Sequence, residues 1–294
     1  MSQPFPFVVE DFEKKLRSTP HLPAMIFQHL DPSTLSKARA VSPDWKEFVD
    51  QRTPLWSTVD YMKAAEQGRE DICSLIIGNS KEKNPAGVGG QTPLHVAVGE
   101  GHLEICRLII SNLEDKQNPA DNTGQTPLHL AAWEGHQEIC RLIISNIDNK
   151  NPADNNGWTP LHMTAQWGYL EICRLIISNL DDNKNPADNK GRTPLHLAAM
   201  EGHLEVCRHI ISNIDDNKNP GDNSGWTALH LAAWEGHLEV CRHIIAIVDD
   251  VNPRNEIGDT PMDYAISVQN WEVVQLFRDN GGIASAPHQE DEQD

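Results

Sequence analysis

The chain has 294 residues, of which 24 are basic and 43 acidic, so its formal net charge is −19. A chain this acidic is repelled by phosphate backbones and by anionic membranes, so we expect neither a nucleic-acid partner nor a membrane partner. No apolar run approaches the roughly 18–20 residues that a membrane helix needs, and the start, MSQPFPFVVEDFEKK, lacks the pattern of a signal peptide. We therefore expect a cytoplasmic protein, or alternatively a nuclear one.

Residues 1–59 contain no repeat and are expected to form a small domain of short helices. The stretch from residue 21 to residue 56 is HLPAMIFQHLDPSTLSKARAVSPDWKEFVDQRTPLW, in which Pro32 and Pro43 separate the helical pieces. It resembles an F-box, the segment by which a protein docks onto the adaptor of an SCF (Skp–cullin–F-box) ubiquitin ligase. The matching residues are Leu22-Pro23, Ile26-Phe27, Leu30-Asp31-Pro32, Leu35, Val41, Trp45 and Leu55-Trp56.

The resemblance implies that five apolar residues contact the ligase adaptor. They are Leu22, Pro23, Leu30, Leu35 and Val41. The sequence departs from the F-box pattern in a shortened stretch before Leu30 and in Ser42, Pro43 and Asp44, which stand where Cys and basic residues are usual. The alternative is a helical cap that covers the first repeat of the array described next.

From about residue 60 the chain repeats itself at intervals of 33 or 34 residues. Segments such as TPLHLAAWEGHQEICRLIISN begin at regularly spaced threonines, and the six cysteines have the same spacing. The threonines are Thr92, Thr126, Thr159, Thr193, Thr227 and Thr260, and the cysteines are Cys73, Cys106, Cys140, Cys173, Cys207 and Cys241. This regularity indicates a repeat architecture with reduced thiols and argues against a framework of disulfides.

Each unit predicts a pair of helices. Thr-Pro favours the start of the first helix, and the glycine of EGH suits the left-handed residue that ends it. A second amphipathic helix follows, with Glu138 and Arg141 as an outward-facing pair, and connectors such as DNKNPADNNG favour turns. A pair this small cannot bury its apolar face alone, so neighbouring units must stack.

These units resemble ankyrin repeats. The resemblance implies an all-α solenoid of six to seven helix-turn-helix units with β-hairpin connectors over residues 60–283, preceded by the F-box-like domain of residues 1–59 and followed by an acidic, disordered tail, 284–294. We expect a monomer outside complexes.

The repeated histidines and cysteines have the spacing of metal ligands, but the array itself favours a structural role. The first unit has Met62 and Arg69 at the two histidine positions, and the fourth unit has Tyr169 at the second of them. We therefore expect hydrogen-bonded histidines, buried cysteines, no metal and no cofactor. Because the chain also lacks G-x-S-x-G, H-E-x-x-H and P-loop motifs, we expect no enzyme.

The units differ from one another at two places, the hairpin and the end of the first helix, which in ankyrin proteins face a concave, ligand-binding groove. The predicted groove residues are Gln125, Trp133, Glu134, Trp158, Gln166, Trp167, Arg192, Met200, Glu201, Trp226, Trp234 and Glu235. Tryptophan is enriched in binding hot spots, so these residues predict a groove for a protein with apolar and basic character. The alternatives are that the tryptophans complete the packing of the stack, or that they form a cage for a methylated lysine.

Together the two resemblances predict a substrate receptor of an SCF-type ubiquitin ligase. The F-box-like segment would bind the adaptor, and through it the cullin, while the groove would hold the target protein. Transfer of ubiquitin would then depend on proximity, without chemistry by this chain. The alternative is a non-catalytic ankyrin scaffold or inhibitor that binds one protein and has no connection to a ligase.

Overall fold

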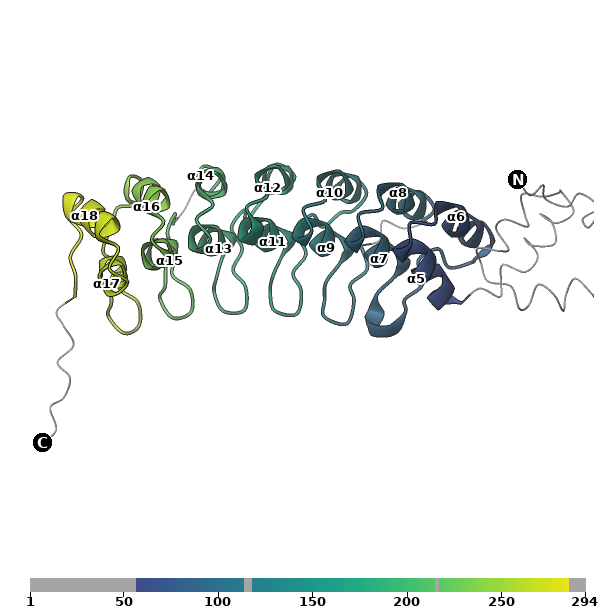
Figure 1. The fold of residues 1–294 in the computed structure, drawn as a ribbon, viewed down its shortest axis with the longest axis horizontal. Helices are drawn as coiled ribbons and strands as arrows, with labels where there is room; N and C mark the ends of the chain where they lie inside the picture. The colour runs from purple at the N-terminus through teal and green to yellow at the C-terminus, as the bar shows by residue number, and fades with distance from the viewer. Residues whose placement is uncertain (1–56, 114–117, 215–216, 286–294) are drawn as a thin grey trace, which may run out of the picture.

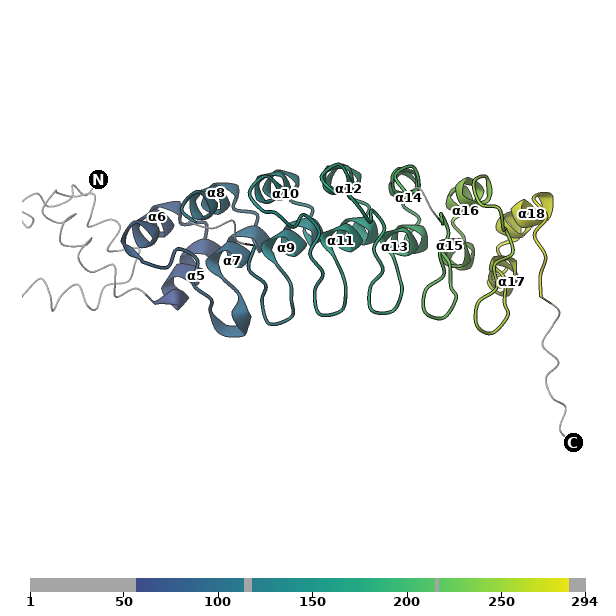
Figure 2. The ribbon, with the colours of Figure 1, turned by 180° about the vertical axis from the view of Figure 1, so that it is seen from behind.

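The computed structural model describes residues 57–113, 118–214 and 217–285. Within these ranges the chain forms a row of seven helix pairs, with the first helices in one layer and the second helices in the other (Figure 1; Figure 2 shows the same two layers from behind). The row is bowed, and the connector loops extend along the inner side of the curve (Figure 1).

The bounds of the helices are α5 (Thr58–Glu66), α6 (Glu70–Asn79), α7 (Pro93–Gly99), α8 (Leu103–Ser111), α9 (Pro127–Trp133), α10 (Gln137–Ile144), α11 (Pro160–Trp167), α12 (Leu170–Ile177), α13 (Pro194–Met200), α14 (Leu204–Ile211), α15 (Ala228–Glu235), α16 (Leu238–Ile245), α17 (Pro261–Ser267) and α18 (Trp271–Asp279), with the short 3₁₀ helix η2 (Val88–Gly90) before α7. The predicted all-α solenoid is confirmed.

The first helices begin as the sequence predicts. In α9, Thr126 is the N-cap residue in an extended conformation and Pro127 is the first helical residue. His129 completes a reciprocal cap, because its Nδ1 accepts from the backbone N–H of Thr126 at 3.1 Å. Since Nδ1 accepts this bond, the proton of the neutral ring is on Nε2, which donates to the carbonyl oxygen of Trp158 in the next repeat at 3.0 Å. The expected structural role of this histidine is confirmed.

The same two bonds recur in four other repeats. The Nε2 atoms of His95, His162, His196 and His230 bond to the carbonyl oxygens of Gln125, Arg192, Trp226 and Asp259, at 2.9–3.2 Å. These histidine side chains are buried, and each one thus joins its own helix start to the following repeat.

The core runs through the array between the two helix layers. In α10, Ile139, Cys140 and Ile143 are buried, whereas Glu138 and Arg141 form the expected ion pair on the outside, at 3.6 Å. All six cysteines are free and buried, and burial raises the pKa of each thiol to about 12. They pack as small apolar side chains.

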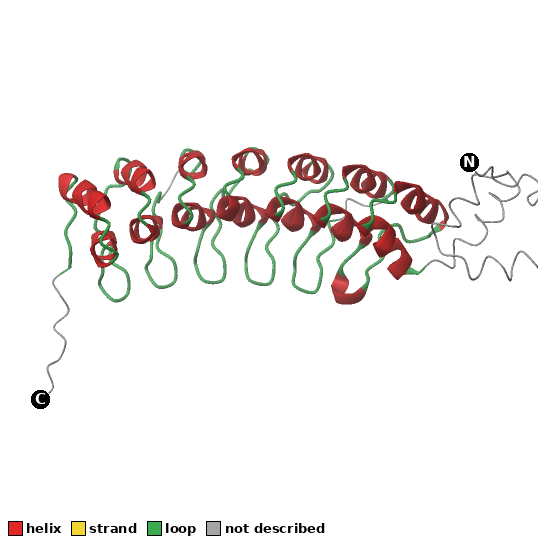
Figure 3. Ribbon diagram, viewed as in Figure 1, coloured by secondary structure: helices red, strands yellow, loops and turns green. Residues whose placement is uncertain are grey.

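The connectors are tight loops instead of strand pairs. Within the described ranges the only β-bridge outside helices is an isolated one between Gly221 and Thr227, and Figure 3 shows the connectors as loops, apart from the short helix η2 before α7. The reason is that a side-chain oxygen accepts a hydrogen bond that a backbone carbonyl would accept in a pair of β-strands. The N–H of Trp158 donates to the Asp154 carboxylate at 2.8 Å, while the N–H of Asp154 donates to the Trp158 carbonyl at 2.7 Å. The expected hairpin shape is present, but without paired strands.

The last repeat ends the array differently. Asp263 replaces the histidine and accepts hydrogen bonds from the N–H and the hydroxyl of Thr260, at 2.7 and 2.8 Å, and from Ser285 N–H at 2.9 Å. Ala284 packs against the core. The first two residues of the segment predicted to be a tail therefore lie against the folded array, where a further repeat would otherwise have stacked.

Candidate functional site

The residues predicted for the groove lie at two places, in the hairpin connectors and at the C-terminal ends of adjoining first helices. Successive first helices, α9, α11, α13 and α15, pack side by side, so the residues at their C-terminal ends form a continuous row (Figure 1). We call this row the tryptophan ridge. Its members are Trp133, Glu134, Gln166, Trp167, Met200, Glu201, Trp234 and Glu235.

Three indole rings on the ridge are open to solvent. Trp133, Trp167 and Trp234 are 40%, 47% and 45% exposed, whereas Met200, at the ridge position of the intervening repeat, is half-buried. Large apolar rings this exposed are costly in water and are available for contact with a partner.

The exposed rings belong to two clusters. Trp133 and Trp167 touch edge to face, with ring centroids 5.1 Å apart. Trp234 lies 5.2 Å from Trp226 of the hairpin, and Trp226 in turn lies 4.3 Å from Tyr264 of the last repeat.

The hairpin residues are more firmly packed than the ridge. Trp158 and Trp226 are half-buried, as is Gln125. Arg192 forms an ion pair with the buried carboxylate of Asp188 at 2.8 Å, and its guanidinium lies 5.5 Å from the centre of the Trp158 ring. Burial opposes ionisation of Asp188, yet the hydrogen bonds from Arg192 hold the pKa of this carboxyl below its ordinary value. These hairpin side chains thus support one another, as the packing alternative predicts for them.

The backbone explains why both variable places tolerate different side chains. The buried histidines bond only to the carbonyl oxygens of the hairpin residues, such as Trp158 and Arg192. A second set of histidines bonds to carbonyls at the ridge: His203 Nε2 lies 3.2 Å from Gln166 O and His237 Nε2 lies 2.9 Å from Met200 O. These bonds use the backbone carbonyl, so they do not depend on which side chain stands at the position, although Trp158 and Met200 also pack against the core.

The ridge carries uncompensated negative charge. Glu100, at the equivalent position of the preceding repeat, and the ridge residues Glu134, Glu201 and Glu235 are exposed, and in the described part of the chain none of the four forms an ion pair. Glu201 accepts a hydrogen bond from Gln166 at 2.5 Å. The first three are the C-cap residues of α7, α9 and α13, where the negative end of the helix dipole adds to the carboxylate.

One residue that the sequence interpretation missed extends this surface. Tyr264 occupies the position of Val96, Leu130, Met163, Leu197 and Leu231 in the other repeats, and it joins Trp226 and Trp234 through ring contacts. Two other exposed residues lie outside the ridge, at the end of the array: Val268 follows α17 and Trp271 begins α18, and they are 42% and 60% exposed. The sequence of the last repeat, TPMDYAISVQNW, was the available signal, because its departures from the repeat pattern include a new aromatic residue in each of its two helices.

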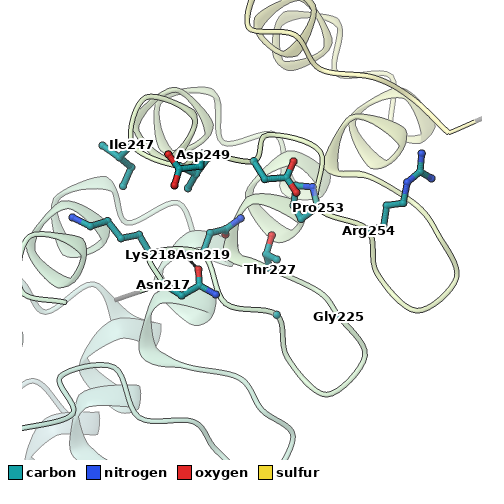
Figure 4. Close-up of a pocket in the computed structure, with 12 residues that line it drawn as sticks. Asn217, Lys218, Asn219, Gly225, Thr227, Ile247, Asp249, Pro253 and Arg254 are labelled. Carbon is teal, nitrogen blue, oxygen red and sulfur yellow. Dashed lines mark hydrogen bonds between the residues drawn. The ribbon is translucent and has the colours of Figure 1, made fainter. Parts of the chain in front are cut away.

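The described residues also enclose clefts between neighbouring connectors. One of about 670 Å³ lies between residues 217–227 and residues 247–254, lined by Lys218, Asn219, Asp249 and Arg254 among others (Figure 4). Its lining is mixed in charge and includes no ridge residue. Within the described ranges no group of three or more His, Cys, Asp or Glu side chains is arranged to hold a metal ion, and no helix has the length and apolarity to span a membrane.

The comparison with known families agrees with this geometry. The family described as "Ankyrin repeats (3 copies)" matches residues 61–153, 147–220, 182–257 and 215–286, which together cover more than half of the chain. The chain belongs to the ankyrin-repeat family. Membership implies a role in protein–protein interaction, and ankyrin repeats are in general scaffolds without enzymatic activity. A search of curated proteins found no match.

The five predicted adaptor contacts, Leu22, Pro23, Leu30, Leu35 and Val41, lie outside the described residues of this ankyrin-repeat protein. The family match begins at residue 61 and does not reach them. The F-box-like segment therefore stays a prediction from sequence.

Proposed function

We propose that this ankyrin-repeat protein binds another protein through the tryptophan ridge. The observation that carries the proposal is that the indole rings of Trp133, Trp167 and Trp234 remain 40–47% exposed. Histidine bonds between repeats at the ridge go to the backbone carbonyls of Gln166 and Met200 and do not involve these rings. A folded chain has no structural need for exposed tryptophans, and tryptophans in such positions dominate many binding interfaces. The exposed glutamates beside them favour a partner with positive charge.

The test is a comparison of two sets of substitutions in the full chain. Replacing Trp133, Trp167 and Trp234 together by alanine is expected to abolish recovery of a partner from cells, measured by affinity purification and mass spectrometry. The matched control is Trp271→Ala, which removes a tryptophan that is 60% exposed and lies outside the ridge, at the edge of the array. If the triple variant recovers the same proteins as the control, the ridge is not the binding surface.

We further propose that the protein is the substrate receptor of an SCF-type ubiquitin ligase. The support is the F-box-like sequence at residues 22–56, placed immediately before a domain of an interaction family. In this arrangement the first segment holds the ligase adaptor and the ridge holds the target, so that target lysines lie at high local concentration near the ubiquitin carrier. The competing proposal is an ankyrin scaffold that recruits no ligase.

Co-purification with the adaptor and the cullin distinguishes these two functions. The natural chain is expected to retain both proteins, and the variant Leu30→Asp/Leu35→Asp is expected to lose them. Circular dichroism of the variant must show an intact array, because loss of binding by an unfolded chain carries no information. If the natural chain retains no adaptor, the ligase proposal is rejected and the scaffold proposal is kept.

A further inference from the structure

The tryptophan ridge has two apolar clusters and an acidic interval between them. The first cluster is Trp133 with Trp167, and the second is Trp226 with Trp234 and Tyr264. The repeat between them contributes the half-buried Met200 and the exposed Glu201 to the ridge, so no exposed ring bridges the gap. A partner that uses both clusters therefore needs two separate apolar side chains.

The stacking of the helices sets the distance between these clusters. Trp167 ends α11 and Trp234 lies at the end of α15, with α13 packed between the two helices. Packed helices lie about 8–10 Å apart, so two steps place the clusters about 16–20 Å from each other. An extended chain covers that distance in about five or six residues, and a helix in about eleven to thirteen.

The negative charge of the ridge indicates which charge a partner carries between and beside the two apolar clusters. Glu134 lies next to the first cluster, Glu235 next to the second, and Glu201 between them, all exposed and without an ion pair in the described ranges. Nearby Arg192 does not neutralise them, because its guanidinium is held by Asp188 and lies over Trp158. The chain as a whole has a net charge of −19, which attracts a cationic partner from a distance.

We infer that the partner is a basic segment with two large apolar side chains about 16–20 Å apart and at least one lysine or arginine between them. This inference rests on the proposed binding function and specifies the chemistry of the ligand for the same surface. The two apolar side chains cover the two clusters, and the central cation meets Glu201.

Selection from a library of random 16-residue peptides tests this pattern without a known partner. The natural full chain serves as bait, and peptides that also bind the Trp133→Ala/Trp167→Ala/Trp234→Ala variant are removed. The expected survivors carry net positive charge and two apolar positions separated by five or six residues, or by eleven to thirteen. For a surviving peptide, Trp167→Ala and Trp234→Ala are each expected to weaken binding tenfold or more, whereas Trp271→Ala leaves binding unchanged.

Charge substitutions provide the second readout. Glu201→Gln is expected to weaken the selected peptides about two- to fivefold and to reduce the salt dependence of binding, while Glu272→Gln, an exposed glutamate outside the ridge, has no effect. Survivors that need only one cluster, or that are neutral or acidic, overturn the inference but leave ridge binding intact. A selection without any ridge-dependent peptide counts against both the inference and the proposed function.

Discussion

His162 in the fourth helix pair donates from Nε2 to the carbonyl oxygen of Arg192 in the fifth, at 3.1 Å, while its Nδ1 accepts from Thr159 N–H. A second proton on this buried ring would be on Nδ1, where it would point at the N–H of Thr159, which is itself a donor. Burial lowers the pKa of His162 from 6.5 to about 4, and it lowers the pKa of the equivalent His95, His129, His196 and His230 as well.

This arrangement predicts that acid destabilises the array. Because the folded state binds fewer protons than the unfolded state, the stabilisation is present above pH 6.5 and is lost as the pH falls toward about 4. His162 alone is expected to account for about 3 kcal/mol of unfolding free energy between pH 7 and pH 4. Urea unfolding followed by circular dichroism at several pH values measures the loss, and His162→Gln should reduce its slope. A stability that does not change over this range would contradict the prediction.

Two glycines of one repeat are expected to respond in opposite directions to alanine. Gly101 has φ 75°, and a Cβ there would lie 2.9 Å from Cε1 of His136. Gly101→Ala is therefore expected to lower the free energy of unfolding by about 1–3 kcal/mol. Gly99 ends α7 with no atom within 4 Å of an added Cβ, so Gly99→Ala is expected to be neutral or to stabilise by up to about 1 kcal/mol. Equal losses in thermal unfolding would show that the left-handed backbone is not the cause.

The cysteines are expected to be unreactive in the folded protein. Each thiol is buried and its pKa is raised to about 12 by burial, so almost no thiolate is present at pH 8. Labelling with an aromatic disulfide reagent should be slow in buffer and should release six equivalents of chromophore in denaturing urea. Rapid labelling of any thiol in buffer would mean that the array opens locally at that repeat.

The bond between Asp263 and Ser285 is expected to hold the last repeat closed. Burial acts to raise the pKa of Asp263, but the hydrogen bonds from Ser285 and Thr260 keep it below its ordinary value. Asp263→Ala is therefore expected to cost about 1.5–3 kcal/mol, with the last repeat opening first in hydrogen exchange. Ser267→Ala, which removes an exposed hydroxyl at the end of α17, is the control and should stay within about 0.5 kcal/mol. Unchanged protection of α17 and α18 in the Asp263 variant would contradict this role.

Much of the fold follows from residues that are close in the sequence. Thr126-Pro127 and His129 make the helix start, Gly135 ends the turn, and Cys140 lies in a buried helix face, all within one unit. Because every internal unit repeats the threonine, histidine, glycine and cysteine, and all but the one with Ala228 repeat the proline, the period and the helix pairs were predictable. The absence of paired strands in the connectors was not, since it depends on the Asp154 carboxylate taking the N–H of Trp158.

The candidate site was predictable in position but not in detail. The differences between repeats identified Trp133, Trp167 and Trp234, which are exposed. They also predicted Trp158 and Arg192 as groove residues of the same kind. In the structure these two lie against each other, and Asp188 holds the arginine.

The sequence by itself thus determined the repeat, the helix pairs and the positions that are free to vary, because these depend on caps, turns and periodicity within about 34 residues. Only the tertiary structure decided which variable side chains remain available to a partner. That outcome depends on where rings from different repeats meet, as Trp226 meets Tyr264 at 4.3 Å, and such contacts are fixed by the stacking of whole helices. The exposure of these side chains therefore depends on contacts between repeats and does not follow from the sequence of one repeat.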